Sequence, residues 1–535
     1  MNERRVIGPP GTGKTHFLSQ VLAYEAKEHG SDRVVACSLT HAAANELAGR
    51  QVPIPAHNIG TLHSFAFRAL GCPEVLETDK HLAHYNTTVP ASLQLSGGRA
   101  KTTLDLDGPP AGSTDGDKRF AAYQLLRARM TPRELWPQEV RAFATAWENF
   151  KREADGIDFT DMLEICYHDV GCHPAAPDVI VADEMQDLSK LSMSLLWKWA
   201  AKADEIVTAG DTDQAIYGFA GADPQVFRDR PAQKQRVLEQ SYRVPAAVHE
   251  VAVNWIRQNT DRDDVTYLPT AKQGDVRYSP ATWNEPTRLL PEVDTHLASG
   301  RSVMLLTTCA YMLRGIITML RDRGIPFHNP YRPTEGAWNP LATRTNQTTA
   351  AMRVLHYLRP FRADGDPEDP ACWTEEELGH WLDLTAKLKT RGAVVPKAEP
   401  YREVDITEVM ALLPEGEVQE ALLYGGERGL RTLRQYLGAK WQRSGAYAID
   451  VALGGGYEAL EQEPRLVVGS VHSVKGGEAD VVYLFPDVSY AGWCEWQTTA
   501  GRNSIRRVFY VGMTRARQEL VLCSPGTTMA VDWYA

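Results

Sequence analysis

The chain has 535 residues, of which 43% are hydrophobic and 23% are charged, and its formal net charge is -11. This composition is typical of a globular protein with two to four domains. The acidic balance excludes a basic footprint over the whole molecule, so any nucleic-acid surface has to be a local patch. The N-terminus runs directly into a strand, which argues against a signal peptide, and no apolar run reaches the roughly 18 residues that span a bilayer.

The eight cysteines show no metal-binding spacing. The nearest pair, Cys166 and Cys172 followed by His173, matches no zinc pattern. We therefore expect reduced structural thiols and a cytoplasmic protein.

A glycine-rich loop, GPPGTGKT, spans Gly8 to Thr15 between a predicted strand at 4–7 and a predicted helix at 16–29. In this context the glycines let main-chain N–H groups close around phosphate oxygens at a helix N-terminus. Lys14 is expected to reach the β- and γ-phosphates, and Thr15 is expected to ligate Mg²⁺. The alternative is a glycine turn that occurs by chance. The phosphate-binding prediction covers Gly8, Pro9, Gly11, Thr12, Gly13, Lys14 and Thr15.

The stretch VIVADEMQD, from Val179 to Asp187, predicts a buried parallel strand that delivers two carboxylates to its C-terminal end. Asp183 suits Mg²⁺ coordination, and Glu184 suits orienting or deprotonating a water molecule. A DE pair alone is weak evidence. It becomes strong evidence at the end of an apolar strand in a chain that opens with a phosphate loop.

The next predicted strand, 205–209, ends in GDTDQAIYGF. Gln214 can sense a γ-phosphate there, while Tyr217 and Phe219 can stack on bases, which is worth about 1–3 kcal/mol per base. A tight turn with two core aromatics explains the same residues. Upstream, His63 in GTLHSF fits either a ligand role or a structural capping role.

Two segments, 68–156 and about 330–463, interrupt the α/β pattern with helical periodicity and polar turns. The first mixes aromatic and basic residues, which fits a DNA-facing surface or a solvated helix face with core aromatics. These residues are Tyr123, Arg127, Arg129, Trp136 and Trp147.

The second half of the chain repeats the α/β pattern. Strands are predicted at 303–307, 325–328, 465–470, 481–485 and 519–523, and helices at 311–323 and 506–517. Arg515 and Arg517 stand two apart on the last helix, so they face different directions. One could serve a phosphate, or both could form an exposed pair.

Together these motifs resemble superfamily 1 helicases of the UvrD/PcrA/Rep type, from Gly8 to Cys523. The match rests on GPPGTGKT, SLTHAAANEL, GTLHSFAFRAL, VADEMQD, AGDTDQAIYGFAGADP, LEQSYR, SVHSVKGGEADVVYL and VFYVGMTRAR, in this order. The resemblance implies an α/β fold with two RecA-like parallel-sheet domains in tandem, each carrying a mainly helical insertion. We expect the first domain at 1–67 and 158–240, its insertion at 68–157, the second domain at 241–335 and 461–535, and its insertion at 336–460.

The resemblance also implies a role for each matching residue. Lys14, Asp183, Glu184 and Gln214 would act in hydrolysis, with Arg243 and Arg515 as arginine fingers from the second half. Tyr242 would stack on adenine and Glu478 would touch the ribose. ATP and Mg²⁺ would be the cofactors, with the metal on Thr15 and Asp183. The single-stranded DNA track would be lined by Thr61, His63, Tyr217, Phe219, His472 and Ser473.

Several positions depart from the family pattern. The upstream block with the adenine-reading glutamine is not in this sequence, which leaves both ATP and GTP as candidates. The other departures concern strand contacts or packing: Leu39, Ala42, Met185, Phe219, Ala220, Gly477 and Ala479.

The function expected from the resemblance is an ATP-driven helicase that moves on single-stranded DNA, 3′→5′ by family likeness, with single-stranded and tailed duplex DNA as partners. It would act in the cytoplasm, as a nucleoid-associated protein or a viral protein in its host. Two alternatives remain: a DNA-stimulated ATPase that remodels protein–DNA complexes without processive unwinding, and a nucleotide-gated binding module without catalysis. No membrane role is expected.

Overall fold

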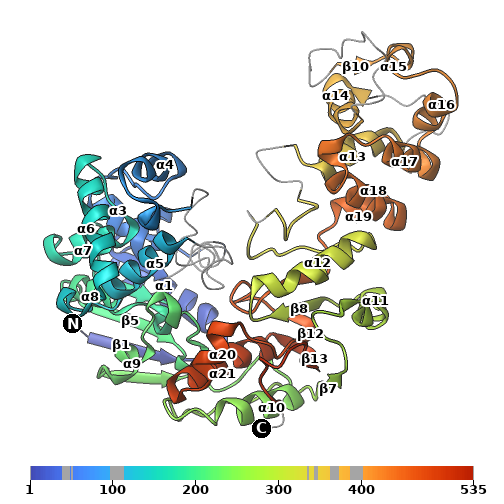
Figure 1. Cartoon of the computed structure of the whole chain (residues 1–535). Coiled ribbons are helices and arrows are strands. Elements are labelled where there is room, and N and C mark those ends of the chain that lie inside the picture. The colour runs from blue at the N-terminus through green and yellow to red at the C-terminus, as the bar shows by residue number, and fades with distance from the viewer. Residues whose placement is uncertain are drawn as a thin grey trace. The chain divides into compact units, whose positions relative to one another are not determined.

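The computed structural model describes residues 2–38, 49, 52–96, 114–333, 336–342, 348–361, 373–385 and 402–533 (Figure 1). Leu39 and Ala42 lie outside the described residues. Within the described ranges, no helix combines the length and the apolar character needed to cross a membrane.

The chain divides into two compact units. Unit 1 comprises Met1–Ser279, Leu306–Tyr311 and Ser470–Ala535, and unit 2 comprises Pro280–Leu305 and Met312–Gly469. All residues of the predicted site belong to unit 1. The bounds predicted for the two domains and their two insertions stay a prediction.

The first sheet of unit 1 is wholly parallel and has the order β3-β2-β4-β5-β1-β6. Its strands are β1 (Asn2–Ile7), β2 (Val34–Ser38), β3 (Ile59–Thr61), β4 (Val179–Ala182), β5 (Glu205–Gly210) and β6 (Lys234–Val237). The central strands are runs of buried β-branched residues, as expected for a sheet covered on both faces. Helix α1 (Lys14–His29) packs Leu18 and Leu22 onto this sheet, and the sheet edge at the strand C-termini carries the phosphate loop.

The helices that follow in the first half are α3 (Leu62–Ala69), α4 (Asp79–Thr88), α5 (Asp115–Ala128), α6 (Gln138–Glu153), α7 (Phe159–Asp169), α8 (Lys190–Ala200) and α9 (Pro224–Asp229) (Figure 1). A second core lies between α4, α5 and α6. Tyr123, Trp136 and Trp147 are buried in an aromatic cluster between these helices. Their side chains are therefore core, as one of the two sequence interpretations had it.

Arg127 is also buried, so it does not lie on a solvated helix face. Its guanidinium bonds to Asp158 at 3.0 Å, Asp161 at 2.6 Å and Glu164 at 2.5 Å. The charge is retained in the interior because three carboxylates surround it.

The second sheet has the order β11-β8-β12-β13-β7. Its strands are β7 (Asp275–Ser279), β8 (Val303–Thr307), β11 (Leu466–Ser470), β12 (Ala479–Leu484) and β13 (Ala516–Cys523). In unit 1, β13 pairs in parallel with β12 and β7, and α10 (Ala246–Ile256), α20 (Tyr490–Trp496) and α21 (Thr499–Met513) accompany it. The two parallel sheets with their helices confirm the prediction of an α/β fold with two RecA-like domains.

The end of the last helix corrects the sequence prediction. Helix α21 stops at Met513, where Thr514 and Arg515 close a turn onto Tyr510 and Gly512, and Arg517 already lies in β13. Arg515 and Arg517 therefore diverge because Arg515 lies in the turn and Arg517 in the strand that follows it, and not because of helical spacing.

Unit 2 consists mainly of helices. Its helices are α11 (Leu290–Ala298), α12 (Leu313–Asp322), α13 (Ala350–Leu358), α14 (Glu375–Leu384), α15 (Ile406–Leu412), α16 (Glu417–Tyr424), α17 (Gly426–Gln435), α18 (Ser444–Gly455) and α19 (Glu458–Glu461). A short antiparallel pair, β9 (Trp373–Thr374) and β10 (Glu403–Val404), accompanies them. The strand predicted at 325–328 is reduced to an isolated bridge between His328 and Val467, because Pro326 has no N–H group to offer to a ladder.

Candidate functional site

The phosphate loop lies between β1 and α1, as its sequence predicts. Gly11 and Gly13 have positive φ angles of 72° and 77°, and Gly13 is the residue that precedes the first turn of α1. A Cβ at Gly8 would come within 2.8 Å of the Thr12 hydroxyl. Lys14 is buried, and its ammonium donates to the Gly8 carbonyl at 2.6 Å. The loop thus has the shape that encloses an anion, with a cation pointed across it.

The segment Ser241–Arg243 of the second half docks directly on this loop. The Tyr242 N–H donates to the Gly11 carbonyl at 2.8 Å, and the Ser241 hydroxyl donates to the Pro10 carbonyl at 3.0 Å. A Cβ at Gly11 would lie 2.6 Å from that of Arg243, so only glycine permits this approach. The Tyr242 ring faces Gly13 and is 78% exposed, which leaves it open to stack on a planar group.

Asp183 and Glu184 follow β4 at the same sheet edge. Asp183 is buried, and its carboxylate accepts from the Glu184 N–H at 2.8 Å. Glu184 adopts a left-handed conformation with φ 53°, which is a strained conformation for glutamate and characteristic of functional sites. Its carboxylate accepts from the Gln186 amide, whose oxygen in turn accepts from the Asp211 N–H at 2.9 Å. Gln186 therefore links β4 to the end of β5.

Gln214 lies in the short helix η7 (Thr212–Gln214) after β5. Its amide donates to the Asp211 carboxylate at 2.6 Å, and its amide oxygen lies 3.5 Å from a guanidinium nitrogen of Arg515. Burial, with the nearby charge of Asp213, raises the pKa of Asp211 to about 7. The turn therefore holds two buried carboxylates next to the glutamine.

Lys475 is a site residue that sequence reasoning missed. Its side chain is 11% exposed, and its ammonium forms an ion pair with Asp187, lies 3.5 Å from the Glu184 carboxylate and donates to the Gln214 carbonyl at 2.9 Å. Burial acts to lower the pKa of Lys475, but the two carboxylates outweigh it and raise the pKa overall. The signal was present in the motif VHSVKGGEAD, but nothing in the sequence says that this lysine reaches Glu184.

The charge of Lys475 sets the state of Glu184. Burial acts to raise the pKa of Glu184, but Lys475 and then Lys14 outweigh it and lower this pKa to about 2. Glu184 is therefore ionised at neutral pH. Asp187 shares the same lysine, yet burial raises its pKa to about 6.

The two arginines of the second half are held in different ways. Arg515 is 1% exposed, and it donates to the main-chain carbonyls of Val511 at 2.9 Å and Gly477 at 3.2 Å. Arg243 is paired with the Glu478 carboxylate at 2.6 Å. Glu478 also accepts from Arg517 at 3.3 Å, so the residue predicted to touch a ribose is occupied by arginines in this structure.

Three of the residues predicted to line a DNA strand lie together. Tyr217, Phe219 and His472 form one aromatic group, with ring centroids 5.3 to 6.1 Å apart. The His472 ring lies 3.2 Å from the Ile216 carbonyl, so the loop of the second half meets the end of η7. A cavity of about 60 Å³ beneath this group is lined by His63, Tyr217 and Phe219 among others.

The hydroxyls of Thr61 and Ser473 have local roles. Thr61 caps α3 by accepting from the Ser64 N–H at 3.2 Å, and Ser473 donates to the Ser470 carbonyl at 2.8 Å. His63 stands in the first turn of α3, with its ring edge-on to Phe159 at 6.4 Å. Contact with a strand stays a prediction for these residues.

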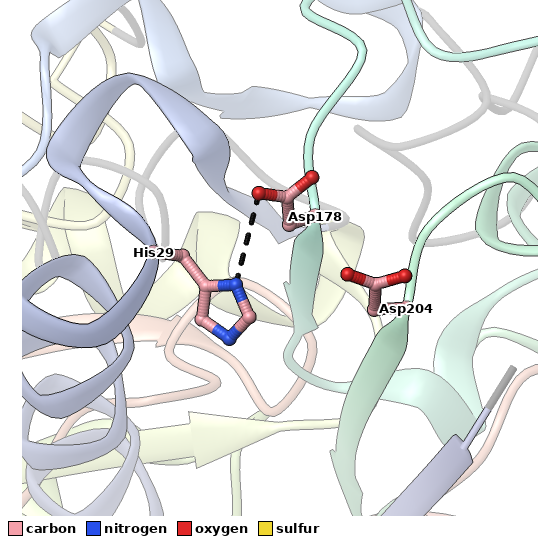
Figure 2. Close-up of side chains that lie close together, drawn as sticks. All are labelled: His29, Asp178 and Asp204. Carbon is pink, nitrogen blue, oxygen red and sulfur yellow. Dashed lines mark ion pairs between the residues drawn. The ribbon is translucent and has the colours of Figure 1, made fainter.

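A second group of possible metal ligands lies at the other end of α1. His29, Asp178 and Asp204 each place one donor atom within 4.8 Å of the others, and Figure 2 shows the His29 ring directed at Asp178. The His29 and Asp178 atoms are 3.7 Å apart. Arg33 already pairs with Asp178 and lowers its pKa. With a guanidinium on one of its carboxylates, we interpret this group as an ion-pair cluster that ties α1 to β4.

Comparisons with known proteins agree with this geometry. Residues 3–220 match the family model described as an AAA domain, and residues 465–523 match the UvrD-like helicase C-terminal domain. The two matches cover the phosphate loop, both carboxylates, Gln214, Lys475 and Arg515. The two matches support a UvrD/PcrA-type superfamily 1 helicase.

Curated relatives of this UvrD-like chain include two proteins named ATP-dependent DNA helicase PcrA. The one from Staphylococcus epidermidis is 23% identical over 323 residues, which cover 55% of this chain and 44% of that protein. The one from Staphylococcus aureus is 24% identical over 281 residues, which cover 48% of this chain and 38% of that protein. The chain thus matches less than half the length of these relatives.

Proposed function

We propose that this protein is an ATP-driven translocase and helicase that moves on single-stranded DNA. The observation that carries the proposal is the convergence of Lys14, Glu184, Gln214 and Arg515, from both RecA-like halves, beside one phosphate loop. A loop with a lysine alone would support nucleotide binding. A loop with an ionised carboxylate and a buried arginine from a second domain supports coupled hydrolysis.

The residues present fit ATP and Mg²⁺. Gly11 and Gly13 take positive φ angles, which let the main-chain N–H groups of the loop turn toward phosphate oxygens, and Lys14 supplies the cation. Thr15 at the start of α1 and the buried Asp183 offer the oxygen ligands that Mg²⁺ prefers. Bound Mg²⁺ would neutralise charge on the phosphates. Tyr242 would stack on the base, and we propose ATP before GTP as the nucleotide.

The chain's own residues then divide the chemistry. Glu184, held ionised by Lys475, orients and deprotonates the attacking water. Arg515 and Arg243 stabilise charge on the transferring phosphoryl group. Gln214 couples the presence of the γ-phosphate to the conformation of the turn that precedes Tyr217. The arginines and the carboxylates belong to different halves, so hydrolysis requires the two halves to be close together. Repeated closing and opening of the halves can then be converted into steps along a DNA strand.

The aromatic group of Tyr217, Phe219 and His472 is the proposed contact with DNA bases, together with Thr61, His63 and Ser473. Stacking of this kind tolerates any sequence. This aromatic group lies next to Gln214 on one side and Lys475 on the other, so a base that moves these rings would act directly on the hydrolytic residues. We propose that the protein acts in the cytoplasm, as a nucleoid-associated protein or as a viral protein in its host.

A DNA-stimulated ATPase that remodels protein–DNA complexes is the second candidate. Its support is the aromatic group itself: Tyr217 is only 5% exposed, and Phe219 with Ala220 departs from the usual family residues. A weaker hold on the strand would permit translocation without strand separation.

One set of assays decides between these functions. The purified chain would be given ATP or GTP with and without single-stranded DNA, and then duplexes with a 3′ or a 5′ tail. Unwinding of the 3′-tailed duplex alone supports the helicase with 3′→5′ movement, and unwinding of only the 5′-tailed duplex overturns that polarity. DNA-stimulated hydrolysis with translocation and no unwinding supports the second candidate. No hydrolysis with any nucleotide overturns both.

A further inference from the structure

A short segment after α10 joins the two halves at the proposed hydrolytic site. It comprises residues 259–263, NTDRD, and is called the strap below. It belongs to the second half by sequence, yet its side chains bond both to η7 of the first half and to α21 of the second. None of its residues was singled out by the motifs.

On one side the strap holds α21. The Asn259 amide donates to the Asn503 carbonyl at 2.9 Å, and the Asn503 amide donates to the Asp261 carboxylate at 2.7 Å. One turn further along the helix, the buried Arg507 pairs with the same Asp261 carboxylate at 2.9 Å. These bonds fix the helix whose C-terminal turn carries Arg515.

On the other side the strap holds η7. Arg262 pairs with Asp213 through two nitrogens, Nη2 at 2.7 Å and Nε at 3.0 Å. The Thr212 hydroxyl donates to the Asp263 carboxylate at 2.7 Å. Both partners in η7 stand immediately before Gln214. The strap therefore touches the two residues that lead into the proposed phosphate sensor.

The Arg262–Asp213 ion pair is partly buried and has a defined geometry. The side chains are 21% and 7% exposed, so the pair is partly withdrawn from water and removal of Arg262 would leave a buried carboxylate without its cation. Two guanidinium nitrogens of Arg262 bond to the one carboxylate of Asp213, and this also fixes the orientation of the two side chains relative to each other. An exposed surface pair would have neither property.

We infer that the strap sets the register between Gln214 and Arg515, and that Arg262 is a positioning residue for nucleotide hydrolysis. Arg262 touches neither the phosphate loop nor the aromatic group in the contacts described above. It acts through Asp213 on η7, while Asp261 holds the helix that leads to Arg515. This inference rests on the proposed function, since it assigns Arg262 a part in that hydrolysis.

The kinetic test uses Arg262→Met, which keeps the length of the stem and removes the charge. We expect kcat with single-stranded DNA to fall about tenfold or more, while the dissociation constant of a fluorescent ATP analogue changes less than about twofold. Arg262→Lys should recover part of kcat, and the exchanged pair Arg262→Asp with Asp213→Arg should recover more than either single variant. An unchanged kcat in Arg262→Met, or equal losses in binding and kcat, overturns the inference.

The matched control is Arg133→Met. Arg133 forms a two-pronged pair with Glu148 at 2.9 Å, but on the exposed surface of the helical segment. It should leave kcat and nucleotide binding unchanged. Thermal unfolding of both variants shows whether a kcat loss follows a general loss of stability.

A second measurement separates this inference from the proposed function. Hydrogen exchange on the nucleotide-free chain requires no hydrolysis. In Arg262→Met we expect faster exchange in both 210–216 and 503–515, beyond any change around 257–264. If exchange rises only around 257–264, the strap couples nothing and the inference is overturned. If the exchange result holds but the wild-type chain hydrolyses no nucleotide, the proposed function fails and the coupling of η7 to α21 stands.

Discussion

The two RecA-like halves hold their charged groups by different means. In the first half, Asp183 and Glu184 sit where β4 ends, so the main chain itself delivers them to the sheet edge. In the second half, Arg515 and Arg243 extend from a turn and a loop. Their positions depend on which groups accept hydrogen bonds from their guanidinium groups. Arg515 is bonded to main-chain carbonyls, whereas Arg243 is bonded to the Glu478 carboxylate.

This difference separates preset groups from groups that must exchange partners. A carboxylate at the end of a strand is positioned by folding alone and does not have to change its bonding partner. Arg515 is nearly preset, because its carbonyl partners cannot leave. Arg243 is not, because Glu478 is also the residue expected to meet the ribose, so nucleotide binding has to compete with an existing ion pair.

The largest effect is expected for the preset arginine. Arg515→Ala should lower kcat by about 10³-fold or more, in line with the loss of an arginine finger, and should change nucleotide affinity by less than about threefold. Steady-state hydrolysis and equilibrium binding measure the two. Arg502→Ala in α21, the helix that precedes Arg515, is the control and should retain kcat. A loss under tenfold in Arg515→Ala would mean that Arg515 only supports the fold.

Loss of the preset carboxylate should come next. Glu184→Gln should lower kcat by about 10²- to 10⁴-fold, the usual contribution of a general base, with nucleotide binding retained. Single-turnover hydrolysis with excess protein measures the chemical step directly. Substantial hydrolysis in this variant would assign the base to another residue.

Lys475 connects the two halves, and its removal should change the pH dependence. Lys475 lowers the pKa of Glu184, which is about 2 in the folded chain, so the wild-type chain should show no acid limb from Glu184 between pH 5 and pH 8. In Lys475→Met this pKa rises, so Glu184 takes up protons at a higher pH. We expect kcat/KM of the variant to fall several-fold more than wild type as the pH drops from about 7 to 5. Parallel pH profiles for the two proteins would contradict the link.

The smallest effect concerns stability in the helical segment of the first half. Glu77 is held by the Gln124 amide and the Phe159 N–H, and burial, with the charge of Asp158, raises its pKa to about 8. A carboxyl with a raised folded pKa adds stability that is complete below its unfolded pKa and is lost as the pH rises through about 8.

Glu77→Gln removes this titration. The midpoint of thermal unfolding of the wild type, relative to that of the variant, should therefore fall by a few degrees between pH 5 and pH 9. Thermal unfolding at matched ionic strength measures it. A difference that stays constant with pH would show that Glu77 is ionised throughout.

Much of the first half could be predicted from the sequence. The loop GPPGTGKT and the strand VIVADEMQD carry their own local signals, because glycine conformations and β-branched runs act over a few neighbouring residues. The end of α21 was placed wrongly, since the pairing of β13 with its neighbours overrides the helical pattern. Tyr123, Trp136 and Trp147 could be either surface or core until the helices packed against one another.

The sequence by itself determined the phosphate loop and the two carboxylates, since each rests on local spacing, and the order of its eight motifs carried the family resemblance that implied the two-sheet fold. Only the tertiary structure decided that Lys475 lies beside Glu184, that Arg243 is paired with Glu478, and that Arg262 is paired with Asp213 of η7. These pairs join residues 49 to 291 positions apart. Their geometry follows from how sheets, turns and helices pack, and no spacing rule along the chain encodes it.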